Sequence, residues 1–395
     1  MIYNKYMTKR GEKMKEIVFP NYHESILNTM STIMNHYGLQ TDYQELPILK
    51  EALNKHYKNI VLMVFDGMGV EMLKRNLKAD DLLNREIKQH LTSVFPSTTT
   101  AAMTAYYAGK SPNEHGWLGW SLYFKEYGRC IDTFINTDSY SGEVIDAPHA
   151  GYTLMPYRHV LDQIEDKTAK TVRTYMIEPA YIKYRANNTK IGVESAQQLV
   201  EEVRKLCEEE GSKFIFSYWP DPDKTMHSMG CYSSETVEKI QEINTLLNKL
   251  YQQSTDTLFI ISADHGLIDV EKTTWLNDYP TLTECFLMPP SIEKRAVSFF
   301  IKPEYKNQFK EQFNHLFKNE FILLTKEEAF EKNIFGLGVS HAKALDFVGD
   351  FLACAIGTKV MGYQTMTQHK KFEFSATHAG LTEEEMIVPL IILES

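Results

Sequence analysis

The stretch "NIVLMVFDGMG", residues 59–69, places a nearly continuous apolar run directly before an Asp-Gly turn. Such a run is typical of a strand that is covered on both faces, as in a parallel sheet. Similar runs occur at 213–219, 257–263, 296–302 and 386–393. Helical patterns lie between them, one over 194–211 that ends in Gly and one over 233–253 that opens with Ser. This alternation predicts an α/β fold with a mostly parallel sheet sandwiched by helices.

The composition narrows the class of protein. The chain has 395 residues, of which 43% are hydrophobic, so it can bury a large core. A formal net charge of −10 argues against a nucleic-acid scaffold, which usually presents a basic face. The five cysteines are widely spaced and form no CxxC pair, which indicates reduced thiols and a cytoplasmic protein. No apolar run approaches the ~18 residues that span a bilayer, and no signal peptide is evident, so we expect no membrane contact.

The alternation of predicted strands and helices also suggests a division into domains. We expect residues 1–14 to form a flexible N-terminal extension. Residues 15–275 and 346–395 are predicted to form the catalytic core. Residues 276–345 contain a strand and short helical pieces, and we expect them to form a smaller inserted α+β cap. Nothing in the sequence predicts an oligomeric state.

Acidic and imidazole side chains follow three of the predicted strands. Asp66 follows the strand at 59–65, Asp223 and His227 follow the strand at 213–219, and Asp264 and His265 follow the strand at 257–263. A single Asp-Gly after a strand is an ordinary turn, but three strands that end in this way indicate a shared site. In an open α/β sheet, ligands bind at the carboxyl ends of the strands.

The residue types and spacings favour metal ions. Asp223 and His227 are four residues apart, so one helical turn places them on the same face. His378, in "SATHAG", adds a third imidazole. Three carboxylates and three imidazoles suffice for two zinc-type sites with three protein ligands each, which leaves the open position of a catalytic metal. Two such ions can clamp a phosphate group, and manganese is the alternative to zinc because Asp and His suit both.

Three successive threonines, Thr98, Thr99 and Thr100, stand before a predicted helix in "SVFPSTTTAAMTAYYAGKSPNEHG", residues 93–116. Ser97 and Thr98 could simply cap this helix. A helix N-terminus also suits a phosphate group, and metal coordination activates a hydroxyl nucleophile. We therefore expect one hydroxyl to cap the helix and another to react.

The motifs "FDG", "FPSTTTAA…AGKSPNEHG", "PDKTMH", "ADHG" and "THAG" occur in the order found in the alkaline phosphatase superfamily. The chain most resembles its type I phosphodiesterase/nucleotide pyrophosphatase branch. The resemblance covers most of residues 58–275 and the tail 346–395. It implies an alkaline-phosphatase-like core and a small phosphate ester as substrate.

The resemblance also implies roles for single residues. Counting back ten residues from Gly109 identifies Thr99 as the nucleophile. One ion would be held by Asp66, Asp264 and His265 with the Thr99 oxygen. The second ion would be held by the remaining three ligands, Asp223, His227 and His378. Attack by Thr99 would give a phosphothreonine, which water would then hydrolyse.

One position departs from the family pattern. Members usually carry an Asn after the "HG" that binds a phosphoryl oxygen, whereas this register places Trp120 there, with Ser121 beside it. Trp can donate only through its ring N–H. Trp120, Ser121 and Arg295 are our candidates for substrate contacts, although an ordinary ion pair is the alternative for Arg295.

The sequence therefore predicts a two-metal hydrolase of phosphoric esters, most simply a phosphodiesterase or nucleotide pyrophosphatase. The alternatives are a phosphomonoesterase and a phosphonate hydrolase of the phosphonoacetate type. A non-catalytic metal- or nucleotide-binding module is the alternative from another class, but the full set of ligands together with a hydroxyl argues against it.

Overall fold

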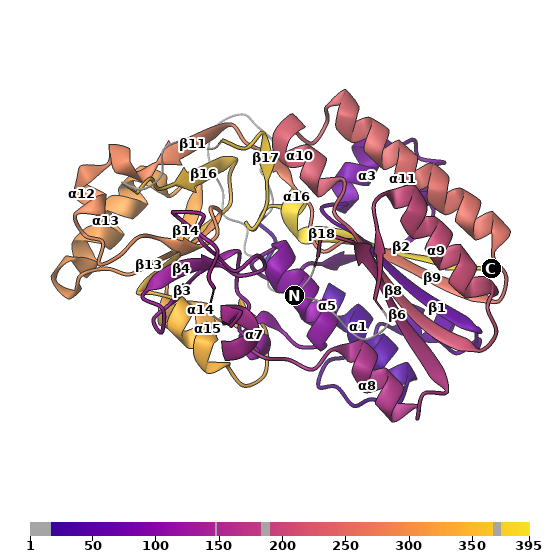
Figure 1. Ribbon diagram of the computed structural model, residues 1–395. Helices are drawn as coiled ribbons and strands as arrows, with labels where there is room; N and C mark the ends of the chain where they lie inside the picture. Colours follow the sequence, from indigo (N-terminus) through magenta and orange to yellow (C-terminus); the bar gives the residue numbers. More distant parts are fainter. Residues whose placement is uncertain (1–16, 147, 183–189, 366–372) are drawn as a thin grey trace.

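The computed structural model of the chain describes residues 17–146, 148–182, 190–365 and 373–395. The predicted N-terminal extension, residues 1–14, lies outside the described residues. Two seven-stranded sheets form the framework of the described part, and helices cover both faces of the sheet that contains β1 (Asn59–Phe65) (Figure 1). No helix in these ranges is both long and apolar enough to cross a membrane.

The main sheet carries the core and confirms the predicted α/β class. Its strand order is β2 (Ile87–Thr92), β18 (Ile387–Glu394), β9 (Thr257–Ser262), β1 (Asn59–Phe65), β8 (Ser212–Trp219), β6 (Val172–Pro179) and β7 (Lys190–Val193). The five strands from β9 to β7 run parallel, and β1 lies between β9 and β8. Every residue of β1 and β9 is buried, which explains their unbroken apolar runs.

Helices pack on both sides of this sheet. On one side lie α3 (Val70–Asn76), α9 (Ala196–Glu208) and α11 (Ser234–Gln253), and on the other lie α1 (Ile26–His36), α5 (Thr99–Ala108) and α8 (Val160–Lys167) (Figure 1). Both α9 and α11 begin at serine side chains that accept a backbone hydrogen bond, Ser195 and Ser233. The sequence pattern predicted this start for α11. Shorter helices complete the core: α2 (Pro47–Leu53), α4 (Leu82–Arg85), α6 (Pro112–His115), α7 (Ala150–Leu154), α10 (Asp223–Met229) and α16 (Glu383–Met386).

The last strand differs from its prediction. β18 runs antiparallel to both β9 and β2, although its apolar run resembles that of the parallel strands. An apolar run reports burial on both faces and carries no information about strand direction.

The second sheet is antiparallel. Its order is β14 (Phe321–Thr325), β15 (Phe351–Ala355), β13 (Ala296–Phe299), β12 (Ser291–Ile292), β3 (Ser121–Phe124), β4 (Arg129–Asp132) and β5 (Thr137–Asp138). The helices α12 (Pro280–Thr283), α13 (Lys306–Phe317), α14 (Lys326–Glu331) and α15 (Ala342–Phe347) accompany it, with two 3-10 turns at Leu276–Asp278 and Pro303–Tyr305.

This second sheet does not coincide with the predicted cap at 276–345. Three of its strands, β3 to β5, come from residues 121–138, well before the predicted cap, and β15 lies beyond residue 345. Two further strand pairs join residues 268–275 to residues 359–377. β10 (Ile268–Asp269) pairs with β17 (Ala376–Thr377), and β11 (Lys272–Trp275) pairs with β16 (Lys359–Gly362). The strand predicted at 296–302 is β13 of this sheet, so it is not part of the parallel layer.

Candidate active site

The site lies where β1, β8 and β9 end and α5 begins. Asp66 directly follows β1, Asp264 lies two residues beyond the end of β9, and Asp223 opens α10 shortly after β8. The backbone carbonyl of Asp66 accepts a hydrogen bond from the amide of Asp223 at 3.0 Å, which joins two of these strand ends. The expected convergence at the carboxyl ends of the parallel strands is therefore present.

Thr99 occupies the first turn of α5, beside this cluster. Its hydroxyl lies 3.2 Å from Nε2 of His265 and donates to Oδ2 of Asp66 at 3.4 Å. The side chain of Thr100 is fully buried, and its Oγ1 has no hydrogen-bond partner among the described residues. Of the two, only Thr99 combines contact with the acidic and imidazole cluster with a place in the cavity wall.

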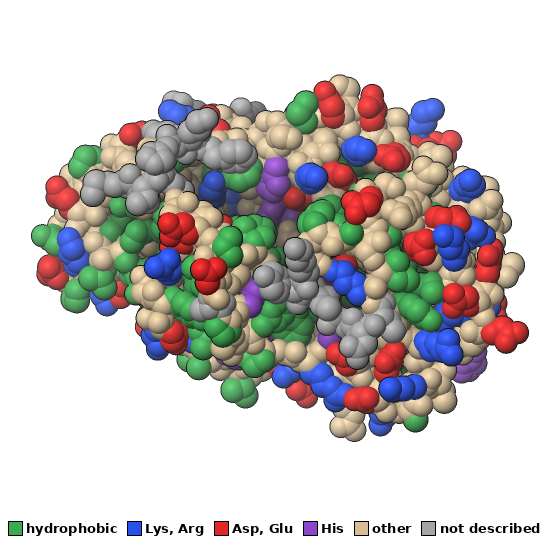
Figure 2. Space-filling model, viewed as in Figure 1, with side chains coloured by type: hydrophobic (Ala, Val, Ile, Leu, Met, Phe, Trp, Pro, Cys, Tyr) green, Lys and Arg blue, Asp and Glu red, His purple; other side chains and the backbone are tan. Residues whose placement is uncertain are grey.

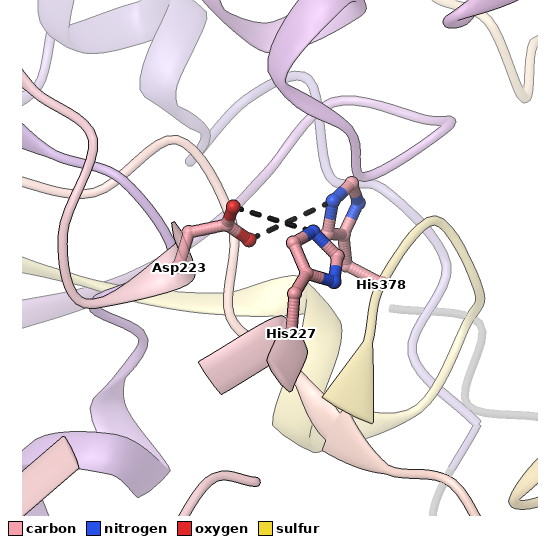
Figure 3. Close-up of side chains that lie close together, drawn as sticks. All are labelled: Asp223, His227 and His378. Atoms are coloured by element: carbon pink, nitrogen blue, oxygen red, sulfur yellow. Dashed lines mark ion pairs between the residues drawn. The ribbon is translucent and has the colours of Figure 1, made fainter. Parts of the chain in front are cut away.

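The first group of candidate ligands comprises Asp223, His227 and His378 (Figure 3). Nε2 of His227 lies 3.3 Å from Oδ2 of Asp223, and Nε2 of His378 lies 3.7 Å from Oδ1 of the same carboxylate. The two imidazoles converge on one carboxylate, with ring centroids 5.2 Å apart. The donor atoms of the group all lie within 4.8 Å of one another, close enough to share an ion.

Backbone carbonyls hold these histidines in the form that binds metal. Nδ1 of His227 lies 2.8 Å from the carbonyl of Ala376, and Nδ1 of His378 lies 3.1 Å from the carbonyl of Ser97. A carbonyl can only accept, so Nδ1 carries the hydrogen in each ring. The neutral imidazole then presents the lone pair of Nε2 to the cluster, which is the usual arrangement at a metal site.

The second group comprises Asp66, Asp223 and His265, again with donor atoms within 4.8 Å of one another. Asp223 therefore belongs to both groups, whereas the resemblance assigned it to one ion only. Asp264 lies beside this group: its Oδ1 accepts from the amides of Gly67 and His265, and its Oδ2 lies 3.4 Å from Nε2 of His265. All six predicted ligands lie in one cluster.

The electrostatics of the cluster fit divalent cations. One oxygen of each of Asp66, Asp223 and Asp264 is buried without a hydrogen-bond donor among the described residues. Burial and the neighbouring carboxylates raise the pKa of Asp66 well above its usual range, and burial raises the pKa of Asp264. Burial opposes ionisation of Asp223 too, but the adjacent imidazoles lower its pKa overall. Carboxylates crowded in this way and lacking donors suit a bound cation.

A cavity of about 830 Å³ opens in front of the cluster and includes Asp66, Thr99, Asp223, His227 and His378 in its wall. In the space-filling view, histidine side chains are visible in a hollow between the two parts of the molecule (Figure 2). The volume lies within the range typical of small-molecule sites. The cluster is therefore accessible to a substrate.

The second sheet supplies much of the opposite wall. Trp120 and Ser121 line the cavity, so both stand where a substrate can reach them, although contact with substrate stays a prediction. Oγ of Ser121 donates to Oγ of Ser139, and the amide of Trp120 donates to Glu293.

Arg295 does not line the cavity, and the prediction that it contacts substrate is wrong. Its side chain is fully buried and makes two bonds to Glu385, from Nε at 2.7 Å and from Nη2 at 2.8 Å. Further bonds run to the carbonyls of Gly357 and Lys359. The arginine lies between β12 and β13 and forms a buried structural ion pair with Glu385.

The predicted cap hydrogen bonds are also wrong. Thr98 is the N-cap residue of α5 by position, but its side chain makes no cap bond. Its hydroxyl instead donates to Glu293 at 2.7 Å, while Ser97 donates to the carbonyl of Gly380 at 2.9 Å. Both hydroxyls thus connect α5 to distant parts of the chain.

Two cavity residues were missed by the sequence reasoning. The Tyr218 hydroxyl donates to Oδ2 of Asp66, and Tyr218 pairs with Val64 across β8 and β1. Its position near the end of a buried strand could have identified it as a site residue. Glu293 comes from the second sheet, and burial raises its pKa to about 7. Nothing local in the sequence marks Glu293, because its partners lie more than 170 residues away.

Comparisons with known proteins identify the family of the chain. A family model described as type I phosphodiesterase / nucleotide pyrophosphatase matches residues 60–373. No curated protein matches the chain significantly. Among solved structures, mouse ectonucleotide pyrophosphatase / phosphodiesterase 5 is 14% identical with a TM-score of 0.62, and the match covers 85% of this chain and 88% of the mouse chain.

Phosphonoacetate hydrolase from Sinorhizobium meliloti, solved with phosphonoformate, is similar to the same degree. It is 15% identical with a TM-score of 0.61, covering 86% of this chain and 91% of the hydrolase. At these identities the structural matches establish a shared fold, whereas the family match spans most of the sequence. The chain therefore belongs to the type I phosphodiesterase / nucleotide pyrophosphatase family of phosphoric ester hydrolases.

Proposed function

We propose that the chain hydrolyses phosphodiesters with Thr99 as the nucleophile and with two divalent ions, most simply zinc, as cofactors. The observation that carries the proposal is the position of the Thr99 hydroxyl. It lies at the start of a helix, 3.2 Å from His265 and 3.4 Å from Asp66, within a cluster of six metal-type ligands.

The ligand set supports two ions. Asp223, His227 and His378 would hold one ion, and Asp66, Asp264 and His265 would hold the other, with Asp223 close enough to reach both. When bound, the ions would supply positive charge that polarises the phosphoryl group and favours the ionised form of nearby hydroxyls. Manganese is the alternative, since the donor types do not separate the two metals.

The chain's own residues then account for the reaction. The Thr99 oxygen attacks phosphorus, the bond from phosphorus to one ester oxygen breaks, and the leaving alcohol takes up the proton that the hydroxyl gave up. A phosphoryl group bound at the start of α5 would meet the first-turn amides of the helix, where the helix dipole favours negative charge. Water then cleaves the bond between phosphorus and Thr99, which frees the hydroxyl and restores the configuration at phosphorus.

Two features support a diester that carries a sizeable group. The cavity has room beyond the phosphate for a substituent, and its wall is partly aromatic, with Trp120, Phe134, Tyr140 and Phe374 among its residues. AMP is bound in a structure of the mouse phosphodiesterase 5, which shares the fold.

All five cysteines are buried free thiols, which supports a reducing compartment such as the cytoplasm.

The test is hydrolysis of bis(p-nitrophenyl) phosphate and p-nitrophenyl phosphate by metal-stripped protein, with zinc or manganese added back. Metal-dependent hydrolysis that prefers the diester supports the proposal. A preference for the monoester would replace it with a phosphomonoesterase. Inactivity on both substrates combined with release of phosphate from phosphonoacetate would replace it with a phosphonate hydrolase.

A further inference from the structure

Glu293 connects the second sheet to the helix that carries Thr99. Its Oε1 accepts a hydrogen bond from the Thr98 hydroxyl at 2.7 Å and another from the backbone amide of Trp120, also at 2.7 Å. Thr98 is the residue immediately before Thr99, at the N-cap of α5. One carboxylate oxygen therefore joins the start of the nucleophile helix to the cavity wall opposite it.

The backbone around Glu293 is arranged to place this carboxylate. Ile292, the residue before it, has φ of 77°, a left-handed conformation that β-branched residues rarely adopt. Ile292 pairs with Ser121 across the sheet, which brings Glu293 next to Trp120. A Cβ on Gly119 would lie 2.8 Å from both Cγ2 and the carbonyl oxygen of Ile292, so only glycine permits this close approach. Strain of this kind persists where the surrounding structure holds it, often at functional sites.

The bond to Glu293 replaces the local bond that Thr98 would ordinarily make. Threonine at an N-cap usually accepts from an amide of its own helix, but here the side chain makes no cap bond. Its hydroxyl donates outward to Glu293. The orientation of Thr98, and with it the backbone that enters Thr99, is thereby fixed by the second sheet.

We propose that Glu293 is a positioning residue for the nucleophile, acting through Thr98. The inference rests on the proposed role of Thr99. Glu293 holds the first turn of α5 so that the Thr99 hydroxyl stays in line with the phosphoryl group. A displacement of about 1 Å at a reacting group can cost on the order of 100-fold in rate, so the loss of this contact should be visible in kcat.

The experiment compares Glu293→Ala, Glu293→Gln and Thr98→Val with the wild-type protein, using a p-nitrophenyl diester and metal at saturation. We expect Glu293→Ala and Thr98→Val each to lower kcat by about 100-fold, with little change in KM and an unchanged metal content. Glu293→Gln should recover most of the activity, because its amide oxygen can accept the same two bonds. The matched control is Glu311→Ala on the exposed face of α13, which should behave like wild type.

A double variant, Glu293→Ala with Thr98→Val, separates the route of action. If Glu293 acts through Thr98, the double variant is no slower than Thr98→Val alone. Multiplied effects would overturn the inference, as would an unchanged kcat in Glu293→Ala. So would a Glu293→Gln variant as slow as Glu293→Ala, because that result would assign the effect to the negative charge.

Two further outcomes need to be distinguished: a variant that does not fold, and failure of the proposed function. If Glu293→Ala does not fold, Thr98→Val carries the test, and a normal kcat in Thr98→Val overturns the inference. Failure of the proposed function looks different: the wild-type protein would not hydrolyse phosphate esters, or Thr99→Ala would remain active. A wild-type enzyme that depends on Thr99 but not on Glu293 contradicts this inference alone.

Discussion

The imidazole of His265 stacks on that of His378, with ring centroids 3.9 Å apart and ring planes 25° apart. The two residues come from distant segments of the chain, His265 from the loop after β9 and His378 from the loop after β17. His265 belongs to one candidate ligand group and His378 to the other, so the stack places the two groups side by side. Burial, followed by the neighbouring His265, lowers the pKa of His378 well below its usual range, so the His378 ring can stay neutral and available to metal.

The first prediction concerns metal stoichiometry. We expect the wild-type protein to bind two zinc ions per chain, and His227→Ala to bind one, because His227 belongs to only one group. Asp223→Asn should lose most of both ions, because Asp223 belongs to both groups. Elemental analysis after gel filtration measures this, with the exposed His315→Ala as the matched control. Retention of two ions by His227→Ala would contradict the assignment.

The second prediction concerns the crowded carboxylates. Because burial and its carboxylate neighbours raise the pKa of Asp66, an ionised Asp66 destabilises the metal-free fold as the pH rises. At pH 8, Asp66→Asn should therefore be more stable than wild type without metal. With zinc at about 1,000 times its Kd, wild type should gain about 4 kcal/mol for each ion that it binds, and the variant should gain much less. Urea unfolding with and without zinc measures both effects, and an equal gain in the two proteins would argue against Asp66 as a ligand.

The third prediction follows from the corrected role of Arg295. Arg295→Ala leaves the buried Glu385 without its cationic partner, and we expect a loss of about 3–5 kcal/mol in the free energy of unfolding. The control is Arg204→Ala on α9, whose more exposed ion pairs with Glu201 and Glu208 should contribute about 0–1 kcal/mol. If Arg295→Ala left stability unchanged but raised KM, the original assignment to substrate binding would be restored.

The fourth prediction concerns acid stability. Burial lowers the pKa of His159 from 6.5 to about 3, so this imidazole is neutral in the folded protein across most of that range. Between these values the unfolded chain binds a proton that the folded chain does not, so stability falls as the pH drops. His159 contributes a slope of about 1.4 kcal/mol per pH unit.

His159→Asn tests this slope. Asparagine can accept the cap bond that Nδ1 of His159 takes from the amide of Leu161, but it does not titrate. The variant loses the ring contact with Tyr107, so it should be less stable at pH 7 and yet lose less stability than wild type between pH 6 and pH 4. Parallel pH profiles of the two proteins would show that His159 is not the group responsible.

Local patterns predicted most strands of the main sheet and brought the candidate ligands to one edge of it. The apolar run at 59–65 is β1, and the helix predicted over 233–253 is α11 at 234–253. Asp66, Asp264 and His265 were recognisable because each follows a buried strand closely in the sequence. These features depend on residues that are close in the sequence, so a local pattern suffices to predict them.

The features that escaped prediction depend on contacts between distant segments. The direction of β18, the place of β3 to β5 in the second sheet, and the carboxylate of Glu293 beside Thr98 all require the chain to be folded first. Arg295 illustrates the same limit, because its partner Glu385 is 90 residues away. The local sequence around an arginine at the start of a strand does not distinguish a contact with substrate from a bond to a buried carboxylate.

The central claim is that Thr99, and neither neighbour, attacks phosphorus. The most direct measurement is an acid quench of the zinc-loaded enzyme during turnover of bis(p-nitrophenyl) phosphate, followed by mass spectrometry of the peptide that contains residues 98–100. We predict a phosphoryl group, with its remaining nitrophenyl ester, on Thr99, and its absence in a Thr99→Ala protein that still binds two ions. An adduct on Thr98 or Thr100, or full turnover by Thr99→Ala, would contradict the account.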